Sequence, residues 1–269
     1  MLISTLAFTF LNASIKFLKE FTPFQLVFFR SIGSLFFTIP FLIRNKISMV
    51  GNKQKLLIIR GVVGVASMLF FFMSMQYLPL GSVVSLRYLA PIFAALFACA
   101  ILKEHIKSIQ WVFFLMAFMG VLIMKGFNSQ IDIIGFVYIL ISAIFSGLVY
   151  VLIRKIGTHD HPVVVVHYYM TIATLVCGVL SIANWRAPQG LEWILLSVLG
   201  LFGYIGQVYM TKALQGTQTS IVAPLKYLEV VFTMIVGIVW FDDLYNFWSL
   251  LRTCLIIMGL VLNMKSKTN

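Results

Sequence analysis

Charged residues are scarce in this chain, and acidic residues are the scarcest among them. Asp, Glu, Lys and Arg together make up 10% of the 269 residues, and Asp and Glu number only 8. Because soluble domains carry roughly 25% charged residues, this composition excludes a soluble globular protein. Cysteine is also rare. Cys99, Cys177 and Cys254 all lie in apolar runs, which indicates packing residues rather than a disulfide framework.

Signatures of catalysis and of metal binding are missing as well. The sequence has no HExxH motif, no glycine-rich nucleotide-binding loop and no cysteine pair at metal-ligand spacing. The segment "HDH" at 159–161 contains metal-binding residue types, but we interpret it as a solvated turn between two apolar runs. We therefore expect no enzymatic activity, no cofactor and no metal. Without an ATP site, any transport by this chain would be secondary.

Long apolar runs occupy most of the chain. Hydrophobic residues make up 61% of it, and the mean hydropathy is +1.01. Runs of about 17–25 residues, long enough to cross roughly 30 Å of hydrocarbon, follow one another closely. The start lacks the features of a cleaved signal peptide, so we expect the first run to be retained. We predict an all-α integral membrane protein in a lipid bilayer, with ten transmembrane helices at 1–19, 23–43, 56–78, 80–102, 109–125, 132–154, 162–183, 191–214, 219–241 and 246–264.

The basic residues predict the orientation of these spans. The net charge of +12 does not indicate nucleic-acid binding, because the basic residues lie in short gaps between apolar runs. Twelve of them, Arg60 included, lie in loops or helix ends on the side of the termini, and four lie on the opposite side. The positive-inside rule then predicts that both termini are cytoplasmic. We expect the inner membrane of a prokaryotic cell.

The two halves of the chain repeat each other at an offset of 139 residues, without a gap from Lys16 to Gly259. The matched pairs are Pro23 with Pro162, Gly61 with Gly200, Gly64 with Gly203, Gln76 with Gln215, Tyr88 with Tyr227, and Glu104 with Asp243. Five spans in each copy, an odd number, predict inverted repeats at 1–125 and 132–264, an arrangement typical of alternating access. The start of the second copy aligns before residue 1, so either the chain starts late or its first helix is short.

Three segments carry a resemblance to a known family. They are "FRSIGSLFFTIPFLI", "FFFMSMQYLPLGSVVSLRYLAPIFAALFACAILKEHI" and "YMTKALQGTQTSIVAPLKYLEVVFTMIVGIVWFDD". They resemble the ten-span EamA-type branch of the drug/metabolite transporter superfamily, and "LKE" at 102–104 and "FDD" at 241–243 are similar to its "LGE" signature with the glycine replaced. The resemblance implies a transporter of metabolites whose cavity is lined chiefly by the third, fourth, eighth and ninth spans. It also implies peripheral fifth and tenth spans, associated with packing or a homodimer contact.

Charges inside the spans are the candidate substrate contacts. A charge at the centre of a bilayer costs about 2.5–3.5 kcal/mol, so it usually faces water, a partner or cargo. Arg87, its repeat equivalent Lys226, and Arg30 would attract a carboxylate or phosphate. The alternative is that these long side chains snorkel to the surface or pack helix ends. We expect a structural role for Arg252, which has no basic repeat equivalent.

Glu229 follows Lys226 by three residues, so the two side chains share a helix face. Either they form an intrahelical ion pair, or Glu229 is a carboxyl that binds a proton or a cationic amine. Further polar candidates at span depth line up with these charges. They are Tyr88, Tyr227, Gln76, Gln207, Tyr204 and Asn12. Pro91 and Pro224 are expected to bend the fourth and ninth helices.

We therefore predict a secondary active exporter or exchanger of a small polar metabolite, such as an amino acid, a nucleotide-like compound or another organic anion or zwitterion. Proton or counter-substrate coupling would drive it. The alternatives are an uptake permease of the same family, for a metabolite such as S-adenosylmethionine, and, in a different class, a channel or a membrane scaffold.

Overall fold

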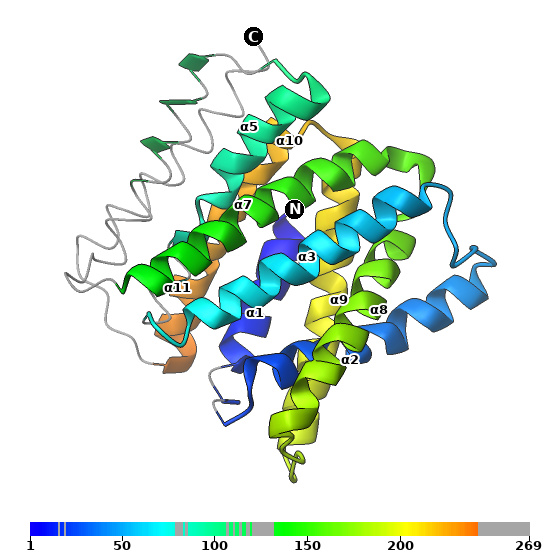
Figure 1. The fold of residues 1–269 in the computed structure, drawn as a ribbon, viewed down its shortest axis with the longest axis vertical. Coiled ribbons are helices and arrows are strands. Elements are labelled where there is room, and N and C mark those ends of the chain that lie inside the picture. Colours follow the sequence, from blue (N-terminus) through cyan, green and yellow to red (C-terminus); the bar gives the residue numbers. More distant parts are fainter. Residues whose placement is uncertain are drawn as a thin grey trace. The chain divides into compact units, whose positions relative to one another are not determined.

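The computed structural model of the protein describes residues 1–15, 17–18, 20–78, 83, 86–105, 108–109, 111–112, 115–116, 119 and 132–241. Within these ranges the regular elements are all helical (Figure 1). The α-helices are α1 (Leu2–Ile15), α2 (Pro23–Arg44), α3 (Gln54–Ser74), α5 (Ala90–Leu102), α7 (Ile133–Ile156), α8 (Pro162–Ser181), α9 (Glu192–Gly216), α10 (Thr219–Val222) and α11 (Leu228–Phe241). Short 3-10 helices are η1 (Gly157–His159), η2 (Ile182–Asn184) and η3 (Ala223–Tyr227).

The membrane class predicted from composition agrees with these helices. Five segments are long and apolar enough to cross a bilayer, and the described part of the chain adds two shorter apolar helices, Leu2–Ile15 and Ala90–Leu102. The five segments are Pro23–Arg44, Gln54–Ser74, Ile133–His159, Pro162–Asn184 and Glu192–Gly216. Most of the predicted span 109–125 and all of 246–264, with Arg252, lie outside the described residues.

Two repeat-equivalent prolines begin helices. Pro23 follows Thr22, whose hydroxyl accepts a hydrogen bond from the Gln25 N–H at the start of α2. Pro162 follows His161, whose Nδ1 accepts from the Val163 N–H at the start of α8. Proline suits the first helical position because its missing N–H would have no partner there in any case. A helix start is therefore repeated at the same place in both halves of the sequence.

The predicted fourth and ninth spans are broken helices. The span expected at 80–102 contains a turn at Tyr88 and Leu89, and α5 begins only at Ala90, with Pro91 in its first turn. The span expected at 219–241 divides into α10, η3 and α11, with Pro224 inside η3. Proline removes a backbone donor and clashes with the preceding turn. The expected bends are therefore present, as interruptions of the helix rather than smooth kinks.

The chain forms two compact units, each assembled from both halves of the sequence. The first unit contains Met1–Val65 and Lys155–Gly216. In it α2 packs against α8 and α9, and α9 also packs against α1 and α8 (Figure 1). Helices α2 and α9 approach closely where Gly33 faces Gly200, and there the Ser34 hydroxyl donates to the Gly200 carbonyl at 2.9 Å. Small residues permit this separation.

The second unit contains Ala66–Arg154 and Thr217–Asn269. Its described core joins α5 to α10 and η3, and η3 to α11. The later part of α3 is held to α7 by reciprocal hydrogen bonds. The Ser67 hydroxyl donates to the Ser142 carbonyl at 2.9 Å, and the Ser142 hydroxyl donates to the Ser67 carbonyl at 2.7 Å. Gly147 of α7 packs directly on the backbone of α5 at Phe93 and Ala94.

Contacts inside the units repeat at the offset of 139 residues. A Cβ on Gly203 would meet Arg30, and a Cβ on Gly64 would meet Tyr169, so the two contacts are related by exchanging repeat-equivalent residues. The contact of Gly33 with Gly200 likewise has its equivalent in the contact of Gly61 with Ile172. In the second unit, Tyr88 and Tyr227, themselves 139 residues apart, lie with ring centroids 5.8 Å apart. Each of these contacts therefore joins a residue of the first half of the sequence to a residue of the second half.

Candidate functional site

Among the described residues of the first unit, Arg60 is the most deeply buried charge. It lies in α3 with 1% of its surface exposed, whereas the topology count treated it as a helix-end residue. Neighbouring helices cover the side chain, so it is not solvated as a loop residue would be. Its Nη2 donates to Gln207 Oε1 of α9 at 3.0 Å, and its guanidinium lies 4.3 Å from the ring centre of Tyr169 of α8. The Nε and Nη1 atoms have no acceptor among the described residues.

Arg30 lies in the same unit, on α2, and is 8% exposed. Its guanidinium carbon lies 5.7 Å from the ring centre of Phe8 of α1. It also packs on α9, because a Cβ on Gly203 would lie 3.0 Å from its Cγ and 3.1 Å from its Nε. The charges of Arg30 and Arg60 repel each other. The first unit therefore holds two arginines in positions shielded from solvent.

Other predicted residues of the first unit contribute in different ways. Gln207 is 8% exposed and is the acceptor for Arg60. Tyr204, one turn earlier on α9, stacks on Phe37 of α2 with ring centroids 5.7 Å apart. Asn12 is half-buried on α1. The structure thus brings Gln207 to Arg60 and packs Tyr204 between helices α9 and α2.

In the second unit, the broken helices carry the predicted residues. Arg87 precedes the turn before α5, and its guanidinium carbon lies 4.1 Å from the ring centre of Phe71 of α3. The buried Tyr227 hydroxyl donates to the backbone carbonyl of Tyr88 at 2.9 Å. A carbonyl in a turn lacks its helical partner, so this hydrogen bond satisfies a buried acceptor at the interruption. Gln76 is exposed, in the turn after α3.

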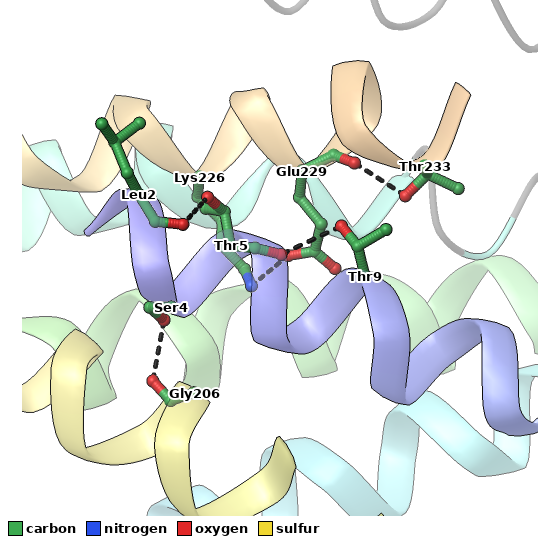
Figure 2. Close-up of polar contacts among 8 residues, drawn as sticks. All are labelled: Leu2, Ser4, Thr5, Thr9, Gly206, Lys226, Glu229 and Thr233. Atoms are coloured by element: carbon green, nitrogen blue, oxygen red, sulfur yellow. Dashed lines mark hydrogen bonds and ion pairs between the residues drawn. The ribbon is translucent and has the colours of Figure 1, made fainter. Parts of the chain in front are cut away.

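Lys226 and Glu229 form an ion pair across the junction of η3 and α11. Figure 2 shows the two side chains pointing toward each other, with the Thr233 hydroxyl bonded to the Glu229 carbonyl at 2.7 Å. Only 17% of the Lys226 side chain and 7% of the Glu229 side chain are exposed. Of the two alternatives for Glu229, the ion pair is present. Pairing lowers the cost of burying both charges.

The first unit has its own polar attachment at the start of the chain, also drawn in Figure 2. The Ser4 hydroxyl of α1 donates to the Gly206 carbonyl of α9 at 2.7 Å. Thr5 and Thr9 donate back to carbonyls of their own helix, at Leu2 and Thr5 respectively. Of the three hydrogen bonds, the one from Ser4 joins two different helices. It holds α1 beside the helix that carries Gln207.

The "LKE" motif at 102–104 has a structural task that sequence reasoning missed. Lys103 ends α5 in the left-handed conformation, at φ 55°, and the Glu104 N–H returns to the Ala98 carbonyl at 3.1 Å. This turn directs Glu104 to α10, where its carboxylate accepts from the N–H groups of Thr219 and Ser220 at 3.1 and 3.2 Å. A carboxylate at a helix start is favourable because the N–H groups there lack partners.

The "HDH" segment is a structural clamp rather than a solvated turn, so that interpretation was wrong for its central residue. Asp160 is 2% exposed. Its carboxylate accepts hydrogen bonds from the backbone N–H groups of Asn52 and Lys53, and its carbonyl accepts from Gln215 Nε2 at 2.9 Å. The segment therefore ties the loop before α3 to the end of α9. The described residues contain no cluster of three or more His, Cys, Asp and Glu side chains placed to hold a metal ion.

Comparisons with known proteins agree with this architecture. The EamA-like transporter family matches the chain twice, at residues 1–125 and 133–265. A pseudopaline exporter of Pseudomonas aeruginosa is 30% identical over 266 residues, covering 97% of this chain and 90% of the relative. Solute carrier family 35 member G1 of Homo sapiens is 26% identical, covering 92% of this chain and 73% of its own length. An S-adenosylmethionine uptake transporter of Rickettsia prowazekii is 24% identical, covering 82% and 75% respectively.

A solved crystal structure matches this chain with a TM-score of 0.89 at 16% identity, covering 99% of this chain and 96% of the other. At that identity the likeness establishes the fold alone. The family match covers both halves of the sequence, and the relatives that carry a function in their names are transporters. The resemblance drawn from the sequence motifs is thereby confirmed. This chain belongs to the EamA-like transporter family of the drug/metabolite transporter superfamily and is an integral membrane transporter rather than an enzyme.

Proposed function

We propose that this protein is a secondary active transporter, an exporter or exchanger, of a small metabolite carrying a carboxylate or phosphate group. The observation that carries the proposal is which buried charged side chains have partners in the structure. Among the described residues, the buried charged side chains are Arg30, Arg60, Asp160 and Glu229. Asp160 is bound by backbone N–H groups and Glu229 is paired with Lys226. Arg60, whose Nε and Nη1 atoms have no acceptor among the described residues, is therefore the buried charge best placed to select an anionic or zwitterionic cargo.

The repeat-equivalent contacts support alternating access as the mechanism. The contacts of Gly203 with Arg30 and of Gly64 with Tyr169 are the same contact made with the two halves exchanged. Inverted repeats allow each half to adopt the conformation of the other, so that a binding site opens to one side of the membrane and then to the other. We extend the proposal to ten spans in two inverted repeats, with both termini in the cytoplasm of a prokaryotic cell and a homodimer as the assembly.

Counterflow in proteoliposomes tests the proposed function. Vesicles containing the purified protein and preloaded with unlabelled L-glutamate, succinate or phosphate would receive the same compound, radiolabelled, from outside. A carrier accumulates label faster when the unlabelled compound is present inside, because the loaded carrier returns more readily. L-lysine serves as the cationic control. Exchange of L-lysine alone would contradict the anionic cargo, and conductance without stimulation by internal substrate would indicate a channel.

Glu229 is the proposed coupling residue within this function. Its ion pair with Lys226 joins η3 to α11 at the interruption of the ninth predicted span. The repeat-equivalent position of Glu229 is Ala90, so the pair has no counterpart in the first half of the sequence. An element present in one repeat only is suited to directional coupling, because it makes the two conformations unequal in energy. Protonation of the carboxylate or binding of a counter-substrate would break the pair.

A further inference from the structure

We propose that Arg60 binds an oxyanion group of the substrate, a carboxylate or phosphate, within the first unit. The inference deepens the proposed function and rests on it. It assigns the anion to a residue that motif-based reasoning did not single out, on α3 rather than on the broken helices. The position is enclosed by α8 and α9 of the same unit.

The donors of Arg60 provide the first argument. A guanidinium carries five N–H groups and accepts no hydrogen bond. The Nη2 atom donates to Gln207 at 3.0 Å, whereas the Nε–H and the N–H groups of Nη1 have no acceptor among the described residues. No Asp or Glu described by the structure lies within salt-bridge distance of this side chain. A buried charge with unsatisfied donors is costly, so the site favours a ligand that supplies acceptor oxygens.

The neighbours of Arg60 restrict how such a ligand approaches. The guanidinium carbon lies over the Tyr169 ring, 4.3 Å from the ring centre, so the ring occupies one side of the group. Gln207 occupies one of the donors at the edge. The remaining donors point outward in the plane of the guanidinium. Carboxylate and phosphate oxygens bind arginine in this plane, through charge-assisted hydrogen bonds about twice as strong as neutral ones.

The second arginine increases the attraction for an anion. Arg30 of α2 is a second buried cation in the same unit, so its charge would add to the attraction for an anion bound at Arg60. Two glycines make room for the arrangement. A Cβ on Gly64 would lie 3.1 Å from the Tyr169 ring and 3.4 Å from Arg60 Nη1, and a Cβ on Gly203 would lie 3.0 Å from Arg30 Cγ. The helix backbones therefore carry no side chain at Gly64 and Gly203, where the Arg60 and Arg30 side chains pack against them.

Ligand-dependent thermal stability of the purified full-length protein tests the assignment. The probes are sodium succinate, sodium L-glutamate and sodium phosphate, against sodium chloride at equal ionic strength. The variants are Arg60→Met, which removes the donors, and Arg60→Lys, which keeps the charge but loses the planar group. Arg44→Gln is the matched control, since it removes an exposed arginine at the end of α2. A ligand that binds only the folded state raises the unfolding temperature.

We expect at least one oxyanion to stabilise the wild type and Arg44→Gln beyond chloride. The same probe should leave Arg60→Met unchanged and bind Arg60→Lys about tenfold or more weakly, as expected for the loss of one charge-assisted hydrogen bond. Succinate or glutamate as the effective probe identifies a carboxylate, and phosphate identifies a phosphoryl group. If Arg60→Met does not fold, the affinity of Arg60→Lys decides. Affinity equal to the wild type in Arg60→Lys, or no stabilisation of the wild type by any oxyanion, overturns the assignment.

Counterflow separates this inference from the proposed function. If an oxyanion binds through Arg60 but is not exchanged across the membrane, the transport function is wrong while the binding site stands. If the oxyanion is exchanged with the same KM by the wild type and by Arg60→Lys, the transport function stands and the role of Arg60 is overturned. A substrate contact should raise KM about tenfold or more in Arg60→Lys, whereas Arg44→Gln retains the wild-type value.

Discussion

Replacing Gly200 by alanine should destabilise the protein strongly, because this glycine lies where two helix backbones touch. A Cβ on Gly200 would lie 2.7 Å from the Cα of Gly33 and 2.8 Å from its carbonyl carbon. Non-bonded carbon atoms prefer separations of about 3.5–4.0 Å. The opposing atoms are backbone, so no side-chain rotation relieves the contact. Helices α2 and α9 must move apart by roughly 1 Å to restore ordinary van der Waals separation.

The expected cost follows from three contributions. Overpacking of a well-packed contact costs about 1–3 kcal/mol. Separation of the helices also weakens the buried hydrogen bond from Ser34 to the Gly200 carbonyl, worth about 1 kcal/mol. Alanine recovers about 1 kcal/mol of helix propensity relative to glycine. We therefore expect the free energy of unfolding to fall by about 1–3 kcal/mol, because the lost hydrogen bond and the gained helix propensity nearly cancel.

Two other glycines are matched controls for this change. Gly216 ends α9, and a Cβ added there would meet no atom within 4 Å, so Gly216→Ala should leave stability unchanged or slightly raised. Gly61 is the repeat equivalent of Gly200, but its Cβ would meet the end of the Ile172 side chain, at Cδ1, which rotates away easily. Thermal unfolding in detergent, followed by tryptophan fluorescence, should rank Gly200→Ala well below both. Equal unfolding temperatures for Gly200→Ala and Gly216→Ala would refute the reasoning.

Three further changes test local features. Lys103→Gly should stabilise the protein by about 1 kcal/mol, because glycine adopts the left-handed conformation of Lys103 without the penalty paid by other residues; chemical denaturation measures the gain. Glu104→Gln should lower the free energy of unfolding by about 1–2 kcal/mol, because a neutral amide replaces the carboxylate bound to two backbone N–H groups of α10. Burial, and secondly the charge of Lys212, lower the pKa of His161 below 6.5. The unfolded chain therefore binds a proton at His161 at a higher pH than the folded chain does, and stability should fall as the pH drops below about 6.5. His161→Asn keeps a capping side chain and should flatten the dependence of the unfolding temperature on pH.

Each of these changes has an outcome that contradicts it. A loss of stability in Lys103→Gly would mean that the lysine side chain contributes more than its backbone conformation costs. Unchanged stability in Glu104→Gln would show that charge is unimportant at the start of α10. An unaltered pH profile in His161→Asn would assign the pH dependence to another group.

The class and family of this protein follow from local sequence patterns. A long apolar run in a bilayer forms a helix, because a helix satisfies all of its own backbone hydrogen bonds where no water is present. Pro91 and Pro224 interrupt helices through their own covalent geometry, so the breaks in the fourth and ninth predicted spans were foreseeable. The spacing of three residues between Lys226 and Glu229 predicted an ion pair as one of two alternatives, and the ion pair is present.

The candidate site needed the tertiary structure. Arg60 is close enough to a run of charged residues in the sequence to be taken for a helix-end residue, yet α8 and α9 bury it, and its partners Tyr169 and Gln207 belong to the other half of the sequence. Asp160 and Glu104 are similar cases, because the N–H groups they bind belong to distant segments. Hydropathy and spacing record what a residue does within its own helix. Which charges end up facing each other depends on long-range packing, and only the folded chain decides it.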